Sequence, residues 1–534
     1  MMEDLCRRIP LISKTIFEEL DNESFVNFKG ASREINSTLK NERFYWITVL
    51  RSYNCLFDEF KETWTKVVKG TPAEFVKEIV LRIDPFYKDK IYTEQKVPFS
   101  PHYIAACCGN TDFYEHCVDR TSVINPKIPT EESTLMHFAA FFGRLEVCQL
   151  IIANIDKVAQ VHIAQEITHL DTWIIENNQD KNPRDSHGYT PLHLAVERGH
   201  FSVCELIIAN IQDINPGDND GETPLHWAAR NGHLELCKLI IENVQNKNPG
   251  TNDDYTALHM AADSGHLNIC KFIIENVQDK NPRDLDGKTP LHEALNCGHL
   301  DVSKFIIESV HDKNPGDEAG FTPLHLAASL GFFDICKLII VNVLDKNPED
   351  IAGSTPLHYA ARSGHLDICE LIIENVQNKN PGDIDGDTPL HRAAINGYLD
   401  VCKLIIENVQ NKNPGDNDSD TPLHRAAANG HLEICKLIIE NVRNKNPGDD
   451  ENNTPLHLSA KYCNLDVCKL IIESIQNDNS GIPLVTVNGK ICTVENPINN
   501  AGFTPLHLAQ DRGNTNVYEY INSIVEKRYP ATKH

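Results

Sequence analysis

Histidine and cysteine, two of the side chains that bind zinc in proteins, recur along this chain at fixed positions. Eleven of the 24 histidines end a Thr-Pro-Leu-His sequence or a variant of it, and nine of the 17 cysteines occupy one matching position further along. Zinc needs ligands that converge on one point. His226 and Cys237 are 11 residues apart, and the matching histidines and cysteines before and after them recur at a fixed interval along the chain. We therefore expect no metal and no cofactor.

The acidic stretch from Asp416 to Asp420 looks like the beginning of a calcium-binding loop, because aspartates alternate along it. Such a loop needs glycine at its sixth position and a bidentate glutamate at its twelfth, but Thr421 and Ala427 stand there. Similar aspartates precede most copies of Thr-Pro-Leu-His. They form either a solvated edge or a surface that steers a basic partner.

The chain contains no sequence motif that is typical of catalysis. It has no P-loop, no Gly-x-Ser-x-Gly, no dinucleotide fingerprint and no His-Glu-x-x-His. A net charge of -26 argues against binding to nucleic acid or to an anionic membrane, and no apolar run approaches the roughly 20 residues that span a bilayer. The sequence predicts a protein that is not an enzyme. Because no signal peptide opens the chain, we place it in the cytoplasm, with the nucleus as an alternative.

The elements that position the histidines are copies of one 33-residue unit. Nine copies keep a single register, and the threonines that open them are Thr190, Thr223, Thr256, Thr289, Thr322, Thr355, Thr388, Thr421 and Thr454. Nine consecutive copies with an unchanged spacing of 33 residues exclude chance repetition.

Each unit reads as two short helices. In the copy that begins at Thr223, the threonine caps a helix whose first residue is Pro224, and His226 is placed to bond back to that turn. Gly232 allows the left-handed backbone of a sharp reversal, and residues 234–244 return as a helix with one apolar face. Two short helices cannot bury that face alone, so the copies must stack.

Nine cysteines share one position of the second helix: Cys148, Cys204, Cys237, Cys270, Cys336, Cys369, Cys402, Cys435 and Cys468. Matching positions in successive units lie too far apart for disulfide geometry. We interpret these cysteines as reduced, buried, small apolar side chains in a reducing compartment.

A 33-residue period that carries Thr-Pro-Leu-His and then Ala-Ala is similar to the ankyrin repeat. The resemblance implies an all-α solenoid of about 12 helix-turn-helix units with short β-turn fingers, preceded by a small helical domain. We divide the chain into an N-terminal helical segment, connecting helices, atypical first repeats with an insertion, nine regular repeats, a second insertion, and a C-terminal capping repeat with a tail: 1–53, 54–97, 98–189, 190–478, 479–502 and 503–534.

Two departures from the regular pattern lead to structural predictions. Thr134 and Thr190 are 56 residues apart, 23 more than the period, so the second helix is longer there or another helix is added. Valine also follows the second helix where the ankyrin family usually has glycine, as at Val244. Because valine resists the left-handed conformation that ends many helices, we expect the second helix to continue past Val244 by about one turn and to end before Pro249.

The second insertion predicts a β-hairpin. Thr454 and Thr504 are 50 residues apart, 17 more than the period. The insertion contains Asn488-Gly489 between two β-branched runs, and both residues accept the positive φ of a type I′ turn.

The N-terminal segment resembles a degenerate F-box. The residues that carry the resemblance are Ile9-Pro10, Ile16-Phe17-Glu18-Glu19-Leu20, Ser32-Arg33 and Trp46. The segment departs from the family at Ile9, where leucine is usual, and at Ala31, where valine is usual. The resemblance implies docking onto a Skp1-type adaptor of a cullin-RING ubiquitin ligase through Ile9, Pro10, Ile16 and Leu20. The alternative is a plain helical cap for the array.

A variable position after each Thr-Pro-Leu-His indicates a surface that could meet another protein. This position holds Trp227, Glu293, Tyr359 and Arg392 among others, and charged side chains are not fully buried unpaired. It is therefore at least partly open. The residues two and three places after the first alanine of Ala-Ala vary similarly, as Ser329-Leu330 and Ile395-Asn396 show. In the ankyrin family these positions face a groove, which makes the following residues candidate client contacts: Trp227, Phe321, Leu330, Tyr359 and Ile395. The alternative for each is ordinary packing between repeats.

Two functions follow from these resemblances. The first is a substrate-recognition subunit of an SCF-type (Skp1-cullin-F-box) ubiquitin ligase, whose ankyrin groove binds the client. The second is an ankyrin-repeat scaffold with no ubiquitin role. An effector that a parasite delivers into a host cell would keep the same architecture. We expect a chain that is monomeric apart from its protein partners.

Overall fold

The computed structural model describes residues 132–164, 180–477, 485–487, 490–492 and 496–528, with a few isolated positions before residue 132. The predicted adaptor contacts Ile9, Pro10, Ile16 and Leu20, and with them segments 1–53 and 54–97, lie outside the described residues. The chain divides into two units, one ending at Asn246 and the other beginning at Lys247.

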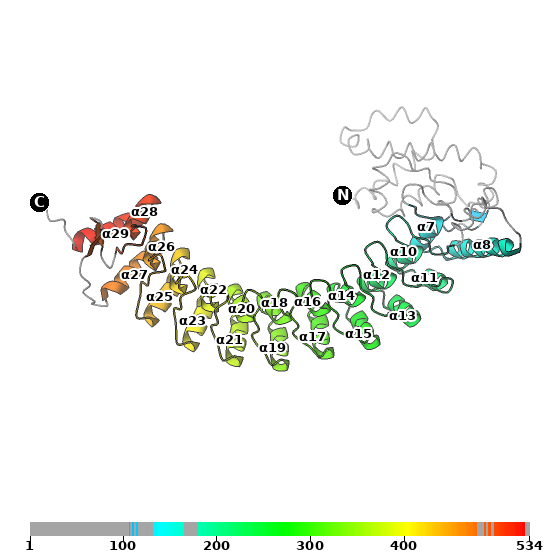
Figure 1. Ribbon diagram of the computed structural model, residues 1–534, viewed down its shortest axis with the longest axis horizontal. Coiled ribbons are helices and arrows are strands. Elements are labelled where there is room, and N and C mark those ends of the chain that lie inside the picture. The colour runs from blue at the N-terminus through cyan, green and yellow to red at the C-terminus, as the bar shows by residue number, and fades with distance from the viewer. Residues whose placement is uncertain are drawn as a thin grey trace, which may run out of the picture. The chain divides into compact units, whose positions relative to one another are not determined.

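The first unit contains helix pairs of the predicted kind. They are α7 (Leu135–Phe141) with α8 (Leu145–Ala164), α10 (Pro191–Glu197) with α11 (Phe201–Ile208), and α12 (Pro224–Arg230) with α13 (Leu234–Asn243). Helix α8 has 20 residues and α13 has ten, so the insertion lengthens the second helix, which is one of the two predicted outcomes. Helix α10 packs between α7 and α12 (Figure 1).

The second unit continues the same alternation. Its pairs are α14 (Ala257–Asp263) with α15 (Leu267–Asn276), α16 (Pro290–Asn296) with α17 (Leu300–Ser309), α18 (Pro323–Leu330) with α19 (Phe333–Asn342), α20 (Pro356–Ser363) with α21 (Leu366–Asn375), α22 (Pro389–Asn396) with α23 (Leu399–Asn408), α24 (Pro422–Asn429) with α25 (Leu432–Asn441), α26 (Pro455–Lys461) with α27 (Leu465–Asn477), and α28 (Pro505–Asp511) with α29 (Thr515–Arg528). The described part of the chain thus confirms the helical solenoid.

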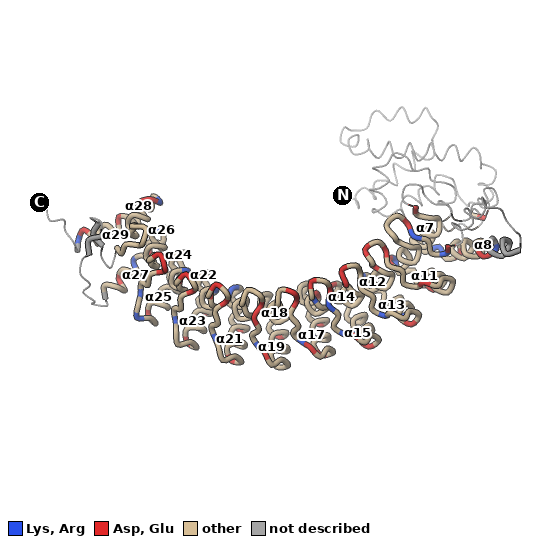
Figure 2. Tube along the Cα trace, in the orientation of Figure 1, with Lys and Arg blue, Asp and Glu red and all other residues tan. Residues whose placement is uncertain are grey.

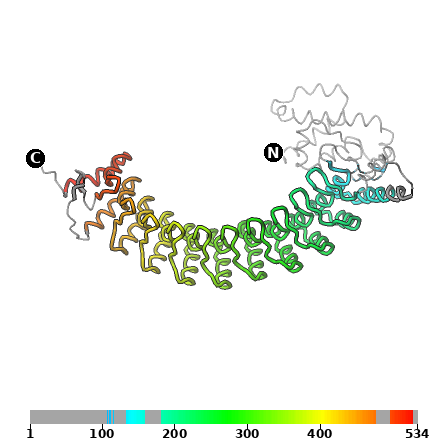
Figure 3. Tube along the Cα trace, in the orientation of Figure 1, coloured from blue at the N-terminus to red at the C-terminus, as the bar shows by residue number. Residues whose placement is uncertain are grey.

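Within the second unit, first helices pack on first helices and second helices on second helices. The pairs form a curved row, with the first helices on its inner side and the second helices on its outer side (Figure 1). Figure 3 shows that sequence order and spatial order coincide along this row. Each pair therefore completes the apolar core of the pair before it.

The first helix begins where the sequence predicts, and the predicted threonine–histidine contact is present. The backbone N–H of Thr322 donates to Nδ1 of His325 at 3.1 Å, and the backbone N–H of His325 faces the Thr322 hydroxyl at 3.4 Å. Pro323 is the first helical residue and needs no partner for an N–H. Asn314, ten residues upstream of Leu324, accepts the N–H of that leucine at 2.8 Å. Together these contacts satisfy N–H groups that a helix start leaves without intrahelical partners.

The same histidine also binds the next repeat. Because Nδ1 of His325 accepts a hydrogen bond, its proton lies on Nε2, which donates to the carbonyl oxygen of Ser354 at 3.1 Å. Equivalent bonds of 3.0 to 3.2 Å join His137 to Tyr189, His193 to Glu222, His259 to Lys288, His292 to Phe321, His358 to Asp387, His391 to Asp420, His424 to Asn453 and His457 to Phe503. We call each of these contacts a histidine bridge.

The core of each pair is narrow and apolar. In the repeat that opens at Thr322, Leu324 and Ala327 of α18 and Ile335 and Ile339 of α19 have no exposed surface. The nine cysteines of the shared position are also fully buried, and all of them are thiols. Burial raises the pKa of the Cys336 thiol to about 12, so that the thiol stays protonated and behaves as a small apolar group.

The prediction that the second helix runs on towards Pro249 is wrong. Helix α13 ends at Asn243, and Val244 adopts an extended conformation with φ -109° and ψ 150°. The side-chain amide of Asn243 donates to the carbonyl oxygen of Leu239 at 2.8 Å, which satisfies an acceptor of the last turn. Valine does resist positive φ, but a helix can also end in extended backbone, which suits a β-branched residue.

The reversal between the two helices requires positive φ, and one repeat lacks the glycine that favours it. Gly331 has φ +82°, and a Cβ there would lie 2.7 Å from the ring of His365. At the corresponding position before α27, Cys463 has φ +68° and is exposed. Asn464 replaces the histidine that follows in most repeats and donates to the carbonyl oxygens of Ala427 and Ala428.

A hairpin lies at the predicted place in the second insertion. Strands β1 (Val485–Val487) and β2 (Lys490–Cys492) pair antiparallel, with Val487 opposite Lys490. This register leaves two residues between the strands, and both of them lie outside the described residues.

We predict that acid unfolds this chain through its buried histidines. Burial lowers the pKa of His292, His358, His424 and His457 from 6.5 to about 4. Below pH 6.5 the unfolded chain takes up protons that the folded chain excludes, so the free energy of unfolding falls between pH 6.5 and pH 4. The loss is about 1.4 kcal/mol per pH unit for each histidine that titrates fully.

Urea unfolding measured from pH 7.5 to pH 4.5 checks this prediction. The variant His358→Gln should be less stable at pH 7.5 but should lose stability less steeply on acidification, because it carries one buried histidine fewer. Equal slopes for the variant and the parent chain would show that His358 is not involved.

We also predict that Cys463→Gly stabilises the chain. Glycine removes the cost of a left-handed non-glycine residue, and the added freedom of the unfolded chain cancels part of the gain, which leaves about 0.5 to 1 kcal/mol. The matched control is Gly397→Cys, which puts a Cβ 2.7 Å from the ring of His431 and should destabilise. Urea unfolding at neutral pH measures both. A destabilised Cys463→Gly variant would contradict the strain argument.

Candidate protein-binding surface

Each first helix is preceded by a tight loop, which we call a finger. In the finger before α18, Oδ1 of Asp317 accepts the backbone N–H groups of Ala319 at 2.9 Å and Phe321 at 2.8 Å. The backbone N–H of Asp317 donates to the carbonyl oxygen of Phe321 at 3.0 Å and closes the loop. An aspartate at this position is therefore a structural residue that shapes its own finger.

Neighbouring fingers are joined to one another through their backbones. The N–H of Glu318 donates to the carbonyl oxygen of Asp286 at 2.9 Å, and the N–H of Ile351 donates to Ala319 at 2.9 Å. The N–H of Ile384 continues the series with Ala352 at 3.0 Å. The fingers of the second unit thus form a continuous ribbon beside the first helices.

Two of the candidate client residues lie side by side. The ring of Phe321 stacks on His325 and meets the ring of Tyr359 edge-on, with both pairs of ring centroids 5.1 Å apart. The Tyr359 hydroxyl donates to Oδ2 of Asp350 at 2.8 Å. Burial, together with this carboxylate, raises the pKa of Tyr359 to about 12, so the hydroxyl remains a donor at neutral pH. Both residues are half-buried.

The other three candidates are separate from this pair. Leu330 and Ile395, at the C-terminal ends of α18 and α22, keep 44% and 39% of their surface exposed. Trp227 belongs to the first unit, where its ring packs 4.9 Å from Tyr189 and 5.6 Å from His193. Trp227 therefore belongs to a different unit from the other four residues. Packing between repeats accounts for much of the surface of Trp227, Phe321 and Tyr359.

The variable position is partly open in most repeats, as predicted. The aliphatic Leu326 and Leu458 are half-buried there, as are Arg392 and Arg425, which contact aspartates of the fingers. The expectation is wrong for Leu194 and Met260, which are 4% and 6% exposed and belong to the core.

Two arginines organise the acidic fingers. Arg392 contacts Asp383 at 2.7 Å and Asp387 at 3.4 Å. Arg425 contacts Asp416 at 2.8 Å and Asp420 at 3.4 Å, and it reaches Asp387 of the preceding finger at 3.8 Å. Sequence analysis missed this network. The signal was a constant spacing of nine residues between the first aspartate of a finger and the variable position, as in Asp383 and Arg392.

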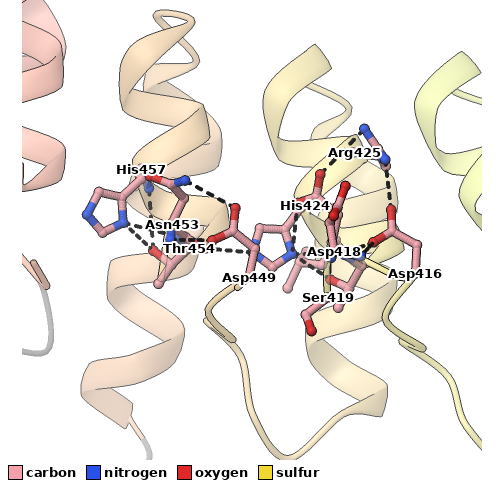
Figure 4. A network of polar contacts seen from close by, with 12 residues as sticks. Asp416, Asp418, Ser419, His424, Arg425, Asp449, Asn453, Thr454 and His457 are labelled. Atoms are coloured by element: carbon pink, nitrogen blue, oxygen red, sulfur yellow. Dashed lines mark hydrogen bonds and ion pairs between the residues drawn. The ribbon is translucent and has the colours of Figure 1, made fainter. Parts of the chain in front are cut away.

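Asp420 is a partly buried carboxylate of this network, and its charged form depends on the nearby Arg425 guanidinium. Burial is the main cause that raises the pKa of Asp420 to about 6, and the Arg425 guanidinium opposes the rise. Figure 4 shows Arg425 and Asp416 beside His424, with Asp449, Asn453 and His457 of the next repeat.

A metal ion does not suit this cluster. Single ligand atoms of Asp387, His391 and Asp416 lie within 4.8 Å of one another. However, Nδ1 of His391 accepts the N–H of Thr388, and Nε2 donates to the carbonyl oxygen of Asp420. Asp416 accepts N–H groups of its own finger and binds Arg425, so its oxygens are committed as well. Oδ1 of Asp416, the first aspartate of the stretch that looks like a calcium loop, is thus used within its own finger.

Comparison with known proteins decides the family. Models of ankyrin repeats in three copies match residues 210–284, 240–317, 258–350, 324–418 and 408–481, which together span more than half of the chain. The chain belongs to the ankyrin-repeat family. A further ankyrin model, built for many copies, matches residues 174–226. Ankyrin arrays present extended surfaces to other proteins, so this chain has a protein–protein interaction role.

One curated relative shares similarity with part of the array. The human transient receptor potential cation channel subfamily A member 1 is 27% identical over 200 residues, which cover 38% of this chain and 14% of the channel. The chain thus spans far less than two thirds of the length of that protein. Within the described part of the chain, no helix combines the length and apolar character needed to cross a bilayer.

We predict that Arg425→Gln destabilises the ankyrin array at neutral pH. Asp387, Asp416 and Asp420 would lose a shared counter-ion in a partly buried place, which costs about 1 to 2 kcal/mol. Because the pKa of Asp420 is raised to about 6, this carboxylate takes up a proton below pH 6, and the difference from the parent chain should shrink by pH 5.

Thermal unfolding at pH 7.5 and pH 5 measures this difference. Arg362→Gln, which removes an exposed arginine from α20, is the matched control and should leave the melting temperature almost unchanged. Equal effects of the two substitutions would argue against the network.

Proposed function

We propose that this ankyrin-repeat chain is a client receptor of an SCF-type ubiquitin ligase. In this proposal the array holds a protein client, and the N-terminal segment docks onto a Skp1-type adaptor. The chain performs no reaction itself. It raises the rate of ubiquitin transfer by holding the client close to the transferring enzyme, since proximity alone lowers a bimolecular barrier. The proposal places the chain in the cytoplasm or the nucleus.

The observation that carries the client-binding part is the exposure of apolar side chains on first helices of the second unit, which form the inner side of the row (Figure 1). Leu330 and Ile395 are both more than a third exposed at the ends of α18 and α22, and the half-buried rings of Phe321 and Tyr359 belong to the same stretch of repeats. Exposed apolar and aromatic residues tend to supply most of the binding energy at protein interfaces.

The adaptor-binding part is supported by the N-terminal sequence. Pro10, Ile16 and Leu20 occupy the positions at which an F-box contacts its adaptor, as the resemblance implies. Ile9, Ile16, Phe17, Leu20 and Phe25 also make up more apolar surface than so small a segment buries alone. A partner protein would cover part of it.

A second candidate function is an ankyrin scaffold without a link to ubiquitin. The departures from the F-box pattern at Ile9 and Ala31 favour it. In this case the N-terminal helices would only cap the array, and the client surface would remain the same.

We predict that the full chain co-purifies with a Skp1-type adaptor and a cullin, and that Pro10→Ala with Leu20→Ala lowers adaptor capture by about tenfold or more, which corresponds to about 1.4 kcal/mol. The variant lies outside the ankyrin array, so client capture should persist. Affinity purification followed by quantitative mass spectrometry measures both.

A matched pair of substitutions controls for surface hydrophobicity in the same experiment. Leu330→Ser with Ile395→Ser should lower client capture, whereas Val341→Ser, which removes an aliphatic side chain that is 75% exposed on α19, should not. Unchanged adaptor capture by the Pro10 and Leu20 variant would favour the scaffold.

A further inference from the structure

The tip of each finger in the second unit carries one residue that joins this finger to the preceding one. This residue is the one whose backbone N–H donates to the preceding finger, as Ile351 donates to Ala319 and Ile384 to Ala352. In the second unit the tip positions are Leu285, Glu318, Ile351, Ile384, Asn417, Asp450 and Asn500. We call this series the tip row.

Three members of the tip row are aliphatic and strongly exposed. Leu285, Ile351 and Ile384 keep 55%, 75% and 65% of their surface in contact with water. Ile351 and Ile384 belong to adjacent fingers, yet neither buries the other. The ribbon needs only their backbone groups, so packing within the array does not account for aliphatic side chains here. Exposed apolar residues grouped in this way mark interaction sites.

The surroundings of Ile351 and Ile384 are acidic. Residues 315–321, 348–354, 381–387, 414–420 and 447–453 hold thirteen aspartates and glutamates and no lysine or arginine. Figure 2 shows the acidic residues recurring on the loops that lead into the first helices. Arg392 and Arg425 pair with aspartates at the base of the fingers, whereas Asp385 and Asp418 lie exposed nearer the tips.

We infer that the tip row is a docking edge for a basic segment of another protein, one in which lysines or arginines flank aliphatic residues. The aliphatic residues of the partner would cover Ile351 and Ile384, and its cations would lie near Asp385 and Asp418. This inference rests on the proposed function, since it names the chemistry of a protein that the ankyrin array receives.

Charge complementarity selects this occupant over others. Nucleic acid and anionic lipid carry the same sign of charge as the fingers, so contact with either would be repulsive. A second copy of this chain has a net charge of -26 and the same acidic edge. A basic partner gains both attraction during encounter and contact with the exposed aliphatic side chains.

The test uses three fluorescein-labelled, amidated peptides with the full-length chain: alternating lysine and leucine, alternating lysine and serine, and alternating glutamate and leucine. Fluorescence anisotropy should show that the lysine–leucine peptide binds, that the lysine–serine peptide binds about tenfold or more weakly, and that the glutamate–leucine peptide does not bind. Raised salt should weaken binding of the lysine–leucine peptide.

Matched variants locate the site. Ile351→Ser with Ile384→Ser should weaken binding of the lysine–leucine peptide by about tenfold. Val341→Ser with Leu344→Ser removes two side chains that are 75% and 101% exposed in and just after α19 and that are not part of the tip row, so it should leave binding unchanged. Asp385→Asn with Asp418→Asn should weaken binding and reduce its dependence on salt.

Two outcomes would overturn the inference. One is equal affinity for the lysine–leucine and lysine–serine peptides, and the other is full affinity in the Ile351 and Ile384 variant. If that variant still captures cellular clients while Leu330→Ser with Ile395→Ser does not, the docking edge is rejected and the client receptor stands. If neither pair of substitutions changes client capture, both proposals are wrong about where the client binds.

Discussion

The histidine bridge is the contact on which the rest of the structure depends. Through Nδ1, His325 accepts the N–H of the threonine that caps its own helix, and through Nε2 it binds Ser354 of the next repeat. One neutral imidazole thus fixes where a helix starts and how the following finger is placed. Because both nitrogens are used inside a buried site, the ring cannot gain a proton or bind a metal without losing one of these contacts.

This arrangement frees the surface of the array for recognition. The bridges, the buried alanines and the second-helix isoleucines form the core of each repeat, whereas several side chains at the finger tips and at the ends of the first helices are exposed and not needed for that core. Side chains there can differ between repeats at small cost. Leu330, Ile351, Ile384 and Ile395 are exposed where other repeats carry polar residues, and the proposed contacts with proteins are built on them.

Much of the fold could be predicted from sequence, because its determinants are local and repeat. Thr-Pro-Leu-His predicts a capped helix start, and a conserved spacing predicts stacking. The sequence did not predict that the second helix ends before Val244. This helix ends in extended backbone, with the Asn243 side chain bonded to a carbonyl oxygen of the last turn, and such an end needs no glycine that could be seen in the sequence. The pairing of Arg425 with two fingers and the exposure of Ile384 depend on how neighbouring repeats lie in space, which a pattern within one repeat does not specify.

The ribbon of fingers has a consequence for how such a chain can change over evolutionary time. Each finger joins the preceding one through a backbone N–H and a carbonyl oxygen, and these atoms are the same whatever the side chains are. If the coding sequence for one 33-residue repeat is duplicated or deleted, the fingers on either side of the change can therefore form the same backbone hydrogen bonds. The length of the array can vary by whole repeats, and a newly duplicated tip can diverge towards a new ligand while its neighbours keep theirs.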